Sequence, residues 1–146
     1  MPTPAAVLDA LYGLLEAEEG SIFRFMHDGS PYLTQATVET RRQIEAMNQA
    51  SHQHAGELAE LITRQNGLIP TAPVQPADQY LSYLSLKFLL PKLAEARRRT
   101  IERYENALRA IKGADPEIIE VLERHLAAHR ADLDILVKPP DASHPV

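Results

Sequence analysis

Cysteine is absent from this chain of 146 residues. Its absence excludes disulfide bonds, thiolate zinc sites, iron–sulfur clusters and cysteine nucleophiles. Any metal ion would have to be held by histidine, aspartate or glutamate. A metal centre in this protein is therefore expected to have nitrogen and oxygen ligands.

Tryptophan is also absent, and glycine is scarce, with six residues. The long segments of the chain are instead rich in Ala, Leu, Glu, Gln and Arg, which favour the helical conformation. With 45% hydrophobic and 24% charged residues, the composition is that of one globular domain. We therefore predict a single all-α domain over residues 1–146.

Charge and hydropathy argue against two classes of partner. Fifteen Lys plus Arg against twenty Asp plus Glu leave a net charge of −5, which disfavours attraction to nucleic acid. No apolar run approaches the roughly 18 residues of a membrane span, and the first residues lack the pattern of a secretion signal. We expect a cytoplasmic protein that binds neither nucleic acid nor a membrane.

The chain has eleven prolines, of which only Pro91 falls inside a predicted helix, while the others, with several capping residues, mark the ends of helices. Thr3–Pro4 and Asp115–Pro116 each combine an N-cap with a proline at the first helical position. Gly67 is expected to end the second helix in the left-handed conformation. The four predicted helices span residues of about 4–27, 34–66, 78–112 and 116–138.

The predicted helices are amphipathic, and four such helices in one chain indicate a bundle, because each apolar stripe needs neighbouring stripes to bury it. The segment of residues 67–90 is long enough to cross the length of the bundle, which predicts a crossover connection between the second and third helices. Residues 80–90 lack a clean polar face, so we expect this stretch either to be covered on both sides within the chain or to form the surface of a homodimer.

The apolar stripe of each predicted helix is interrupted near its middle by polar side chains. Glu18 interrupts the first stripe, Arg97 the third and His129 the fourth. Ser51 and His54 occupy consecutive core positions of the second stripe. Because burying an unpaired charge costs several kcal/mol, we expect these five side chains to meet at a common interior point.

Three further polar residues lie close to these stripes. Glu19 is the alternative inward carboxylate if the register of the first helix is shifted by one residue. His125, four residues before His129, is predicted to be partly exposed. Glu57 is a candidate hydrogen-bond acceptor for the ring nitrogens of His54 or His129.

These residues resemble the ferritin-like superfamily, and bacterioferritin in particular. Glu18 matches the first-helix carboxylate of that family's di-iron site, and His54 and His129 match its two histidines. The stretch HAGELAELITRQNGLIP is similar to the family's second helix as it runs into the crossover. The resemblance implies a ferritin-like four-helix bundle with a crossover and a di-iron centre.

Four residues decide what the resemblance implies about cofactors. Ser51, Arg97 and Leu126 stand where the family places its other three glutamates, and a guanidinium at a bridging position would repel both iron ions. The resemblance therefore implies a di-iron site that has degenerated. His52 stands at the position from which a bacterioferritin-like dimer can ligate haem, and its other interpretation is a surface histidine.

Two hypotheses describe what such a degenerate site does. In the first, Arg97 takes the place of the metal and pairs with Glu18 in a buried hydrogen-bond network that needs no cofactor and has a structural or interaction role. Ser51, His54 and His129 complete this network. In the second, Glu18, His54 and His129 bind a single iron, manganese or zinc ion in a redox or oxygen-handling protein.

Overall fold

Four helices make up the part of the chain that the structure, a computed structural model, describes, namely residues 2–20, 38–69 and 86–138. They are α1 (Pro4–Glu19), α2 (Val38–Arg64), α3 (Leu86–Ala110) and α4 (Pro116–Val137). These ranges contain no strand. The prediction of an all-α four-helix fold is confirmed.

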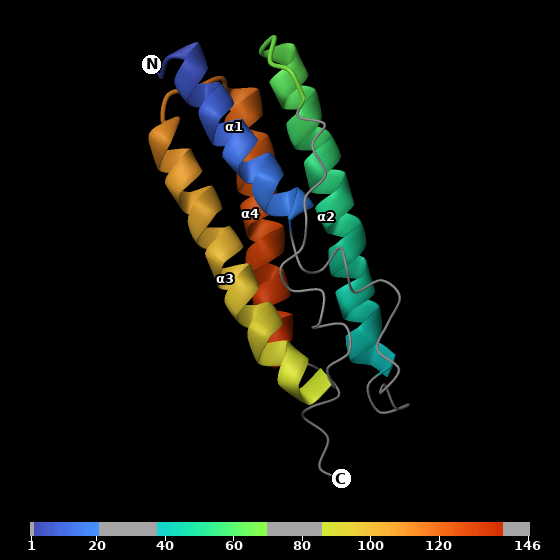
Figure 1. Cartoon of the computed structure of the whole chain (residues 1–146). Helices are drawn as coiled ribbons and strands as arrows, with labels where there is room; N and C mark the ends of the chain where they lie inside the picture. Colours follow the sequence, from blue (N-terminus) through green and yellow to red (C-terminus); the bar gives the residue numbers. More distant parts are fainter. Residues whose placement is uncertain (1, 21–37, 70–85, 139–146) are drawn as a thin grey trace.

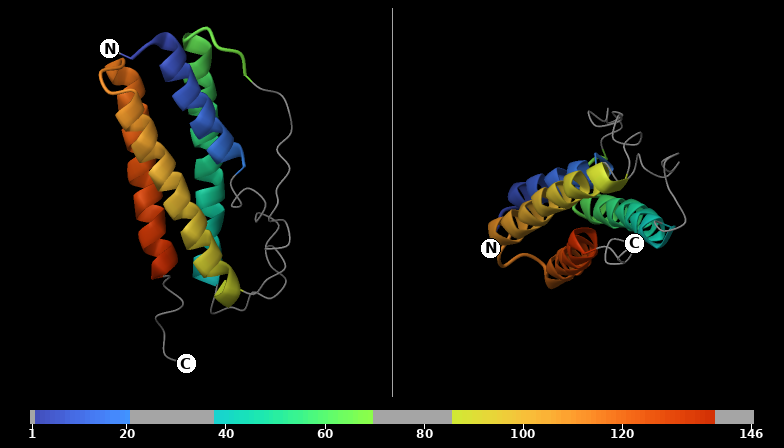
Figure 2. Two further views of the ribbon diagram at one scale, coloured as in Figure 1. Left: turned by 60° about the vertical axis from the view of Figure 1, so that its left-hand side comes forward. Right: turned by 90° about the horizontal axis from the view of Figure 1, so that it is seen from below.

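The helices pack in two neighbouring pairs (Figure 1). α1 packs against α2, α3 packs against α4, and contacts of α1 with α3 and of α2 with α4 complete the bundle. α2 and α3 run in the same direction, whereas α1 and α4 run in the opposite direction (Figures 1 and 2). The crossover expected between α2 and α3 depends on residues 70–85, which lie outside the described residues, so it stays a prediction.

The two predicted N-caps are confirmed. The Thr3 side chain accepts a hydrogen bond from the Ala6 N–H, and the Asp115 side chain accepts one from the Glu117 N–H, at 3.1 and 2.9 Å. Each cap precedes a proline at the first helical position, where no backbone N–H is needed. The starts of α1 and α4 are therefore encoded locally.

The end of α2 differs from its prediction in one detail. The left-handed residue is Asn66, with φ of 63°, and not Gly67. Gly67 is required for a different reason, because a Cβ atom there would lie 2.7 Å from atoms of Ile62, Leu8 and Tyr12. The glycine therefore allows the chain to pass close to α1.

One further predicted helix boundary is changed, and others lie outside the described residues. The first helix ends at Glu19 instead of near residue 27, because Gly20 caps it and donates its N–H to the Glu16 carbonyl at 2.9 Å. The expected continuation over residues 21–27 lies outside the described residues, as do residues 34–37 of the second prediction and 78–85 of the third. Pro91 lies inside α3, which continues through it.

The apolar core is divided into two clusters along the bundle. The larger cluster draws on all four helices and includes Leu11, Leu58, Ile101 and Leu122. The smaller cluster consists of buried residues from the other end of α2, α3 and α4: Ile44, Met47, Leu93, Ala94 and Leu136. Along each of these three helices, the polar interruption lies between the two clusters.

No helix of the described residues combines the length and apolar character that a membrane span requires.

Replacing Leu122 with alanine tests the larger cluster. Leu122 is fully buried, so Leu122→Ala should lower the free energy of unfolding by about 2–5 kcal/mol through lost burial and the cavity left behind. Leu68→Ala is the matched control, because Leu68 is 85% exposed and its loss should cost less than about 0.5 kcal/mol. Urea denaturation followed by circular dichroism measures both, and equal losses would contradict this core.

Candidate functional site

The five polar side chains predicted to face inward are all buried in the structure. Glu18, Ser51, Arg97 and His129 are at most 1% exposed, and His54 is 7% exposed. The sequence left open whether Glu18 or Glu19 is the inward carboxylate of the first helix, and the structure shows that Glu18 is the buried one. The neighbouring Glu19 is only half-buried.

The Glu18 carboxylate is the centre of this cluster, because it is contacted by all three other helices. Ser51 of α2 donates its hydroxyl to Oε1 at 2.9 Å. The other oxygen, Oε2, lies 3.2 Å from His54 Nδ1 of α2, 2.6 Å from the Tyr104 hydroxyl of α3 and 2.7 Å from His129 Nε2 of α4. A single carboxylate therefore connects α1 to the rest of the bundle.

These contacts determine the charge of Glu18. Burial alone would raise its pKa, but hydrogen bonds from His129, His54 and Tyr104 outweigh burial and hold the pKa well below the ordinary value. Burial and the negative charge of Glu18 raise the pKa of Tyr104. Glu18 is thus an ionised acceptor, and the Tyr104 hydroxyl keeps its proton to donate.

Arg97 acts on Glu18 through His129. Its NH1 atom lies 2.5 Å from His129 Nδ1, and its NH2 atom lies 3.5 Å from Asp132 Oδ2. A guanidinium only donates, so His129 Nδ1 must accept, and the ring proton of neutral His129 is then on Nε2, where it is donated to Glu18. Arg97 and Glu18 are thus connected through the ring of His129. The direct Arg97–Glu18 pair expected from the sequence stays a prediction.

The contacts of Arg97 with His129 and Asp132 form one branch of the network, and the pKa shifts of these groups agree with its hydrogen bonds. Burial lowers the pKa of His129, which favours the neutral ring that can accept from Arg97. Burial also lowers the pKa of Arg97, but a guanidinium starts from so high a value that it stays charged. Burial raises the pKa of Asp132, and the charge of Arg97 opposes this.

A second branch leads from the same carboxylate toward the surface. The Tyr104 oxygen lies 3.1 Å from His125 Nδ1, and His125 Nε2 lies 3.1 Å from Glu57 Oε1. Arg124 binds both carboxylate oxygens of Glu57, at 3.1 and 2.6 Å, and lowers the pKa of Glu57 to about 2. The branch therefore ends in a partly exposed, strongly ionised ion pair.

Sequence reasoning missed three members of this network and misplaced one contact. His125 was expected to be partly exposed, but it is fully buried and stacks on His54 with ring centroids 4.0 Å apart. Nothing in the sequence pattern marks Tyr104, which lies on the apolar stripe of its helix, or Asp132 as a member of the network. Glu57 contacts His125 instead of His54 or His129.

A helical spacing could have found two of these residues. His125 precedes His129 by four residues, and Tyr104 follows Arg97 by seven, so each pair shares a helix face. A tyrosine on an apolar stripe, however, cannot be told from an ordinary core residue by sequence, because only the structure shows what its hydroxyl binds. His52 is exposed on α2.

The donor set of a two-histidine, one-carboxylate metal site is present. One ligand atom from each of Glu18, His54 and His129 can be chosen so that the three lie within 4.8 Å of one another. The chemistry of these donors fits a metal poorly for two reasons. Arg97 places the His129 proton on Nε2, which is the nitrogen that faces Glu18. Glu18 Oε2 also has three polar partners already. A site for two cations fits less well, since the buried Arg97 adds a positive charge to the same cluster.

Comparisons with protein-family models, with curated proteins and with solved structures find no match to this chain. Fold and site together define the class of protein, which is an all-α four-helix bundle with a buried histidine–carboxylate cluster. The ferritin-like resemblance therefore depends on the matching residues of the sequence alone.

Removing one hydroxyl tests the hydrogen bond between Tyr104 and Glu18. Tyr104→Phe keeps the buried ring and deletes only the donor to the carboxylate, so it should destabilise the protein by about 1–3 kcal/mol. Tyr12→Phe is the matched control, because its hydroxyl donates to the Leu68 carbonyl at an exposed site and its loss should cost less than about 1 kcal/mol. Chemical denaturation at pH 7 compares the two variants, and a larger loss for Tyr12→Phe would contradict the assignment.

The stability of the protein should fall on mild acidification because of His125. Burial and the charge of His54 lower the pKa of His125 to about 4 in the folded chain, whereas the ordinary value is 6.5. Protonation therefore favours the unfolded chain, so the stability is complete above pH 6.5 and is lost between about pH 6.5 and 4, by up to about 3 kcal/mol. Denaturation curves from pH 7.5 to 4.5 measure this loss. His125→Asn should flatten the dependence, and a profile identical to that of the parent protein would exclude His125 as its source.

Proposed function

We propose that this protein is a ferritin-like four-helix bundle in which a buried polar network stands in place of a di-iron centre, and that its role is structural or interactive. The observation that carries the proposal is the Glu18 carboxylate, which takes its hydrogen-bond partners from all three other helices. Such an arrangement specifies how four helices pack together. It needs no cofactor.

The charges in the network support this proposal. Arg97 and Glu18 are both about 1% exposed or less and are connected through His129, while Asp132 pairs with the guanidinium. Breaking one partner of a buried charge network costs about 3–5 kcal/mol, whereas an intact network imposes one arrangement on its members. The same burial leaves little surface at Glu18 or Arg97 for a substrate.

The second candidate function is that of a mononuclear metalloprotein with redox or oxygen-handling activity. It is favoured by one observation, the closeness of the ligand atoms of Glu18, His54 and His129. In this alternative the three residues would bind a single iron, manganese or zinc ion, and the His129 proton would have to leave Nε2.

The net charge of −5 would repel the negatively charged phosphate backbone, so we do not expect nucleic acid to be a partner. We further propose that the protein is a cytoplasmic homodimer.

Metal analysis of the purified protein separates the two candidates. The network hypothesis predicts no stoichiometric iron, manganese or zinc, and a thermal midpoint that EDTA leaves unchanged. Near-stoichiometric metal that disappears in His54→Ala and His129→Ala would support the mononuclear site and overturn the first proposal.

Arg97→Met makes this test sharper, because it removes the donor that places the His129 proton on Nε2. If Arg97 is what excludes a cation, the folded variant should bind Co²⁺ with a visible absorption band where the parent protein does not. Arg97→Met combined with His129→Ala is the control and should lose the band. Circular dichroism establishes that each variant is folded.

A further inference from the structure

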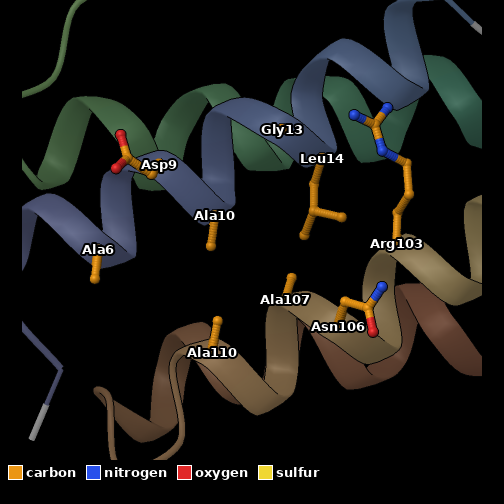
Figure 3. A pocket seen from close by; sticks show the side chains of 9 residues that line it. All are labelled: Ala6, Asp9, Ala10, Gly13, Leu14, Arg103, Asn106, Ala107 and Ala110. Carbon is orange, nitrogen blue, oxygen red and sulfur yellow. The ribbon is translucent and has the colours of Figure 1, made fainter.

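An open groove lies between α1 and α3, away from the polar network (Figure 3). Its volume is about 490 Å³. Side chains from both helices face it across the gap, and its lining is mostly apolar: Ala6, Ala10, Leu14, Ala107 and Ala110. The groove is therefore shaped by the short side chains of two packed helices.

Gly13 lies along this groove and has no packing role within the described residues. A Cβ atom added there would meet no atom within 4 Å. A glycine in a helix interior costs about 1 kcal/mol relative to alanine. No close approach by the described chain compensates for this cost, and a second molecule seated in the groove would provide one.

The charges beside the groove have a diagonal arrangement. Asp9 of α1 lies near one end, and Arg103 of α3 lies near the other end (Figure 3). Neither forms an ion pair with another described residue, although Arg99, on the same helix as Arg103, pairs with Glu95. One acid and one base are thus available on opposite helices and at opposite ends.

We propose that the groove binds a second copy of this chain across a two-fold axis near Gly13. A two-fold axis that lies in the interface, perpendicular to the line from Asp9 to Arg103, exchanges these two positions, so Asp9 of each copy faces Arg103 of the other. This is the self-complementarity that an isologous interface requires. The short apolar lining lets the two α1 helices approach closely.

The size of the surface sets the strength of this dimer. At 1.5 Å per residue α1 is about 24 Å long, and two neighbouring helices are about 20 Å wide, so the face covers about 480 Å² of each copy. The total is close to the roughly 1,000 Å² at the lower limit of specific interfaces. We expect a dissociation constant in the micromolar range.

Sedimentation equilibrium over micromolar concentrations tests the proposal, because the parent protein should dimerise reversibly. Gly13→Gln extends a side chain into the groove from a Cβ position that meets no atom within 4 Å, and it should weaken the dimer at least about tenfold while leaving the thermal midpoint of the monomer unchanged or higher. Gly56→Gln is the matched control. Gly56 is also a helical glycine whose added Cβ would meet nothing within 4 Å, but it lies on α2.

Charge reversal tests the two-fold arrangement itself. Arg103→Glu places two acidic groups opposite each other and should weaken the dimer at least about tenfold, and adding Asp9→Arg should restore it. Arg98→Glu, an exposed arginine on another face of α3, should have no such effect.

The absence of cysteine allows a direct readout of proximity. Under mild oxidation, Gly13→Cys should form a covalent dimer, and Gly56→Cys should stay monomeric. A parent protein that is monomeric at 200 μM, about a hundred times a micromolar dissociation constant, would overturn the proposal. A dimer insensitive to both Gly13→Gln and Arg103→Glu would do the same.

Discussion

A buried, ionised carboxylate at the end of α1 is the constraint on which the rest of the structure depends. Glu18 is the second-last residue of α1, where the free carbonyls of the last turn already make the surroundings negative. A charge in that position is stable only if donors reach it. The donors come from α2, α3 and α4, so the height and rotation of every helix are tied to one side chain, and the two apolar clusters pack on either side of it.

The network extends from this carboxylate in two chemically different directions. One branch passes through His129 to Arg97 and Asp132 and stays in the interior, where a guanidinium decides which ring nitrogen carries a proton. The other branch passes through the Tyr104 hydroxyl, His125 and Glu57 to an exposed arginine. A cation and its anions are thereby held in the middle of the bundle by contacts with one another and with the ring of His129.

α1 connects the interior of the protein with its outer surface. The same short helix presents Glu18 to the network and, on another face five residues earlier, Gly13 to the groove beside α3. The network and the proposed dimer therefore involve the same helix of 16 residues, although each rests on its own residues.

The start of α1 at Thr3–Pro4, the start of α4 at Asp115–Pro116 and the inward register of Glu18, Ser51, His54, Arg97 and His129 could all be predicted from the sequence. They follow from local capping and from a period of 3.6 residues, which a chain carries before it folds. The sequence did not reveal that Arg97 contacts the ring of His129, that His125 is fully buried or that the Tyr104 hydroxyl joins the network. Those contacts depend on how far each helix is rotated and shifted along its neighbours, and only packing in three dimensions determines that. The sequence by itself determined which faces turn inward, and the tertiary structure decided which inward groups meet, because a hydrogen bond forms only when two atoms from different helices come within about 3 Å.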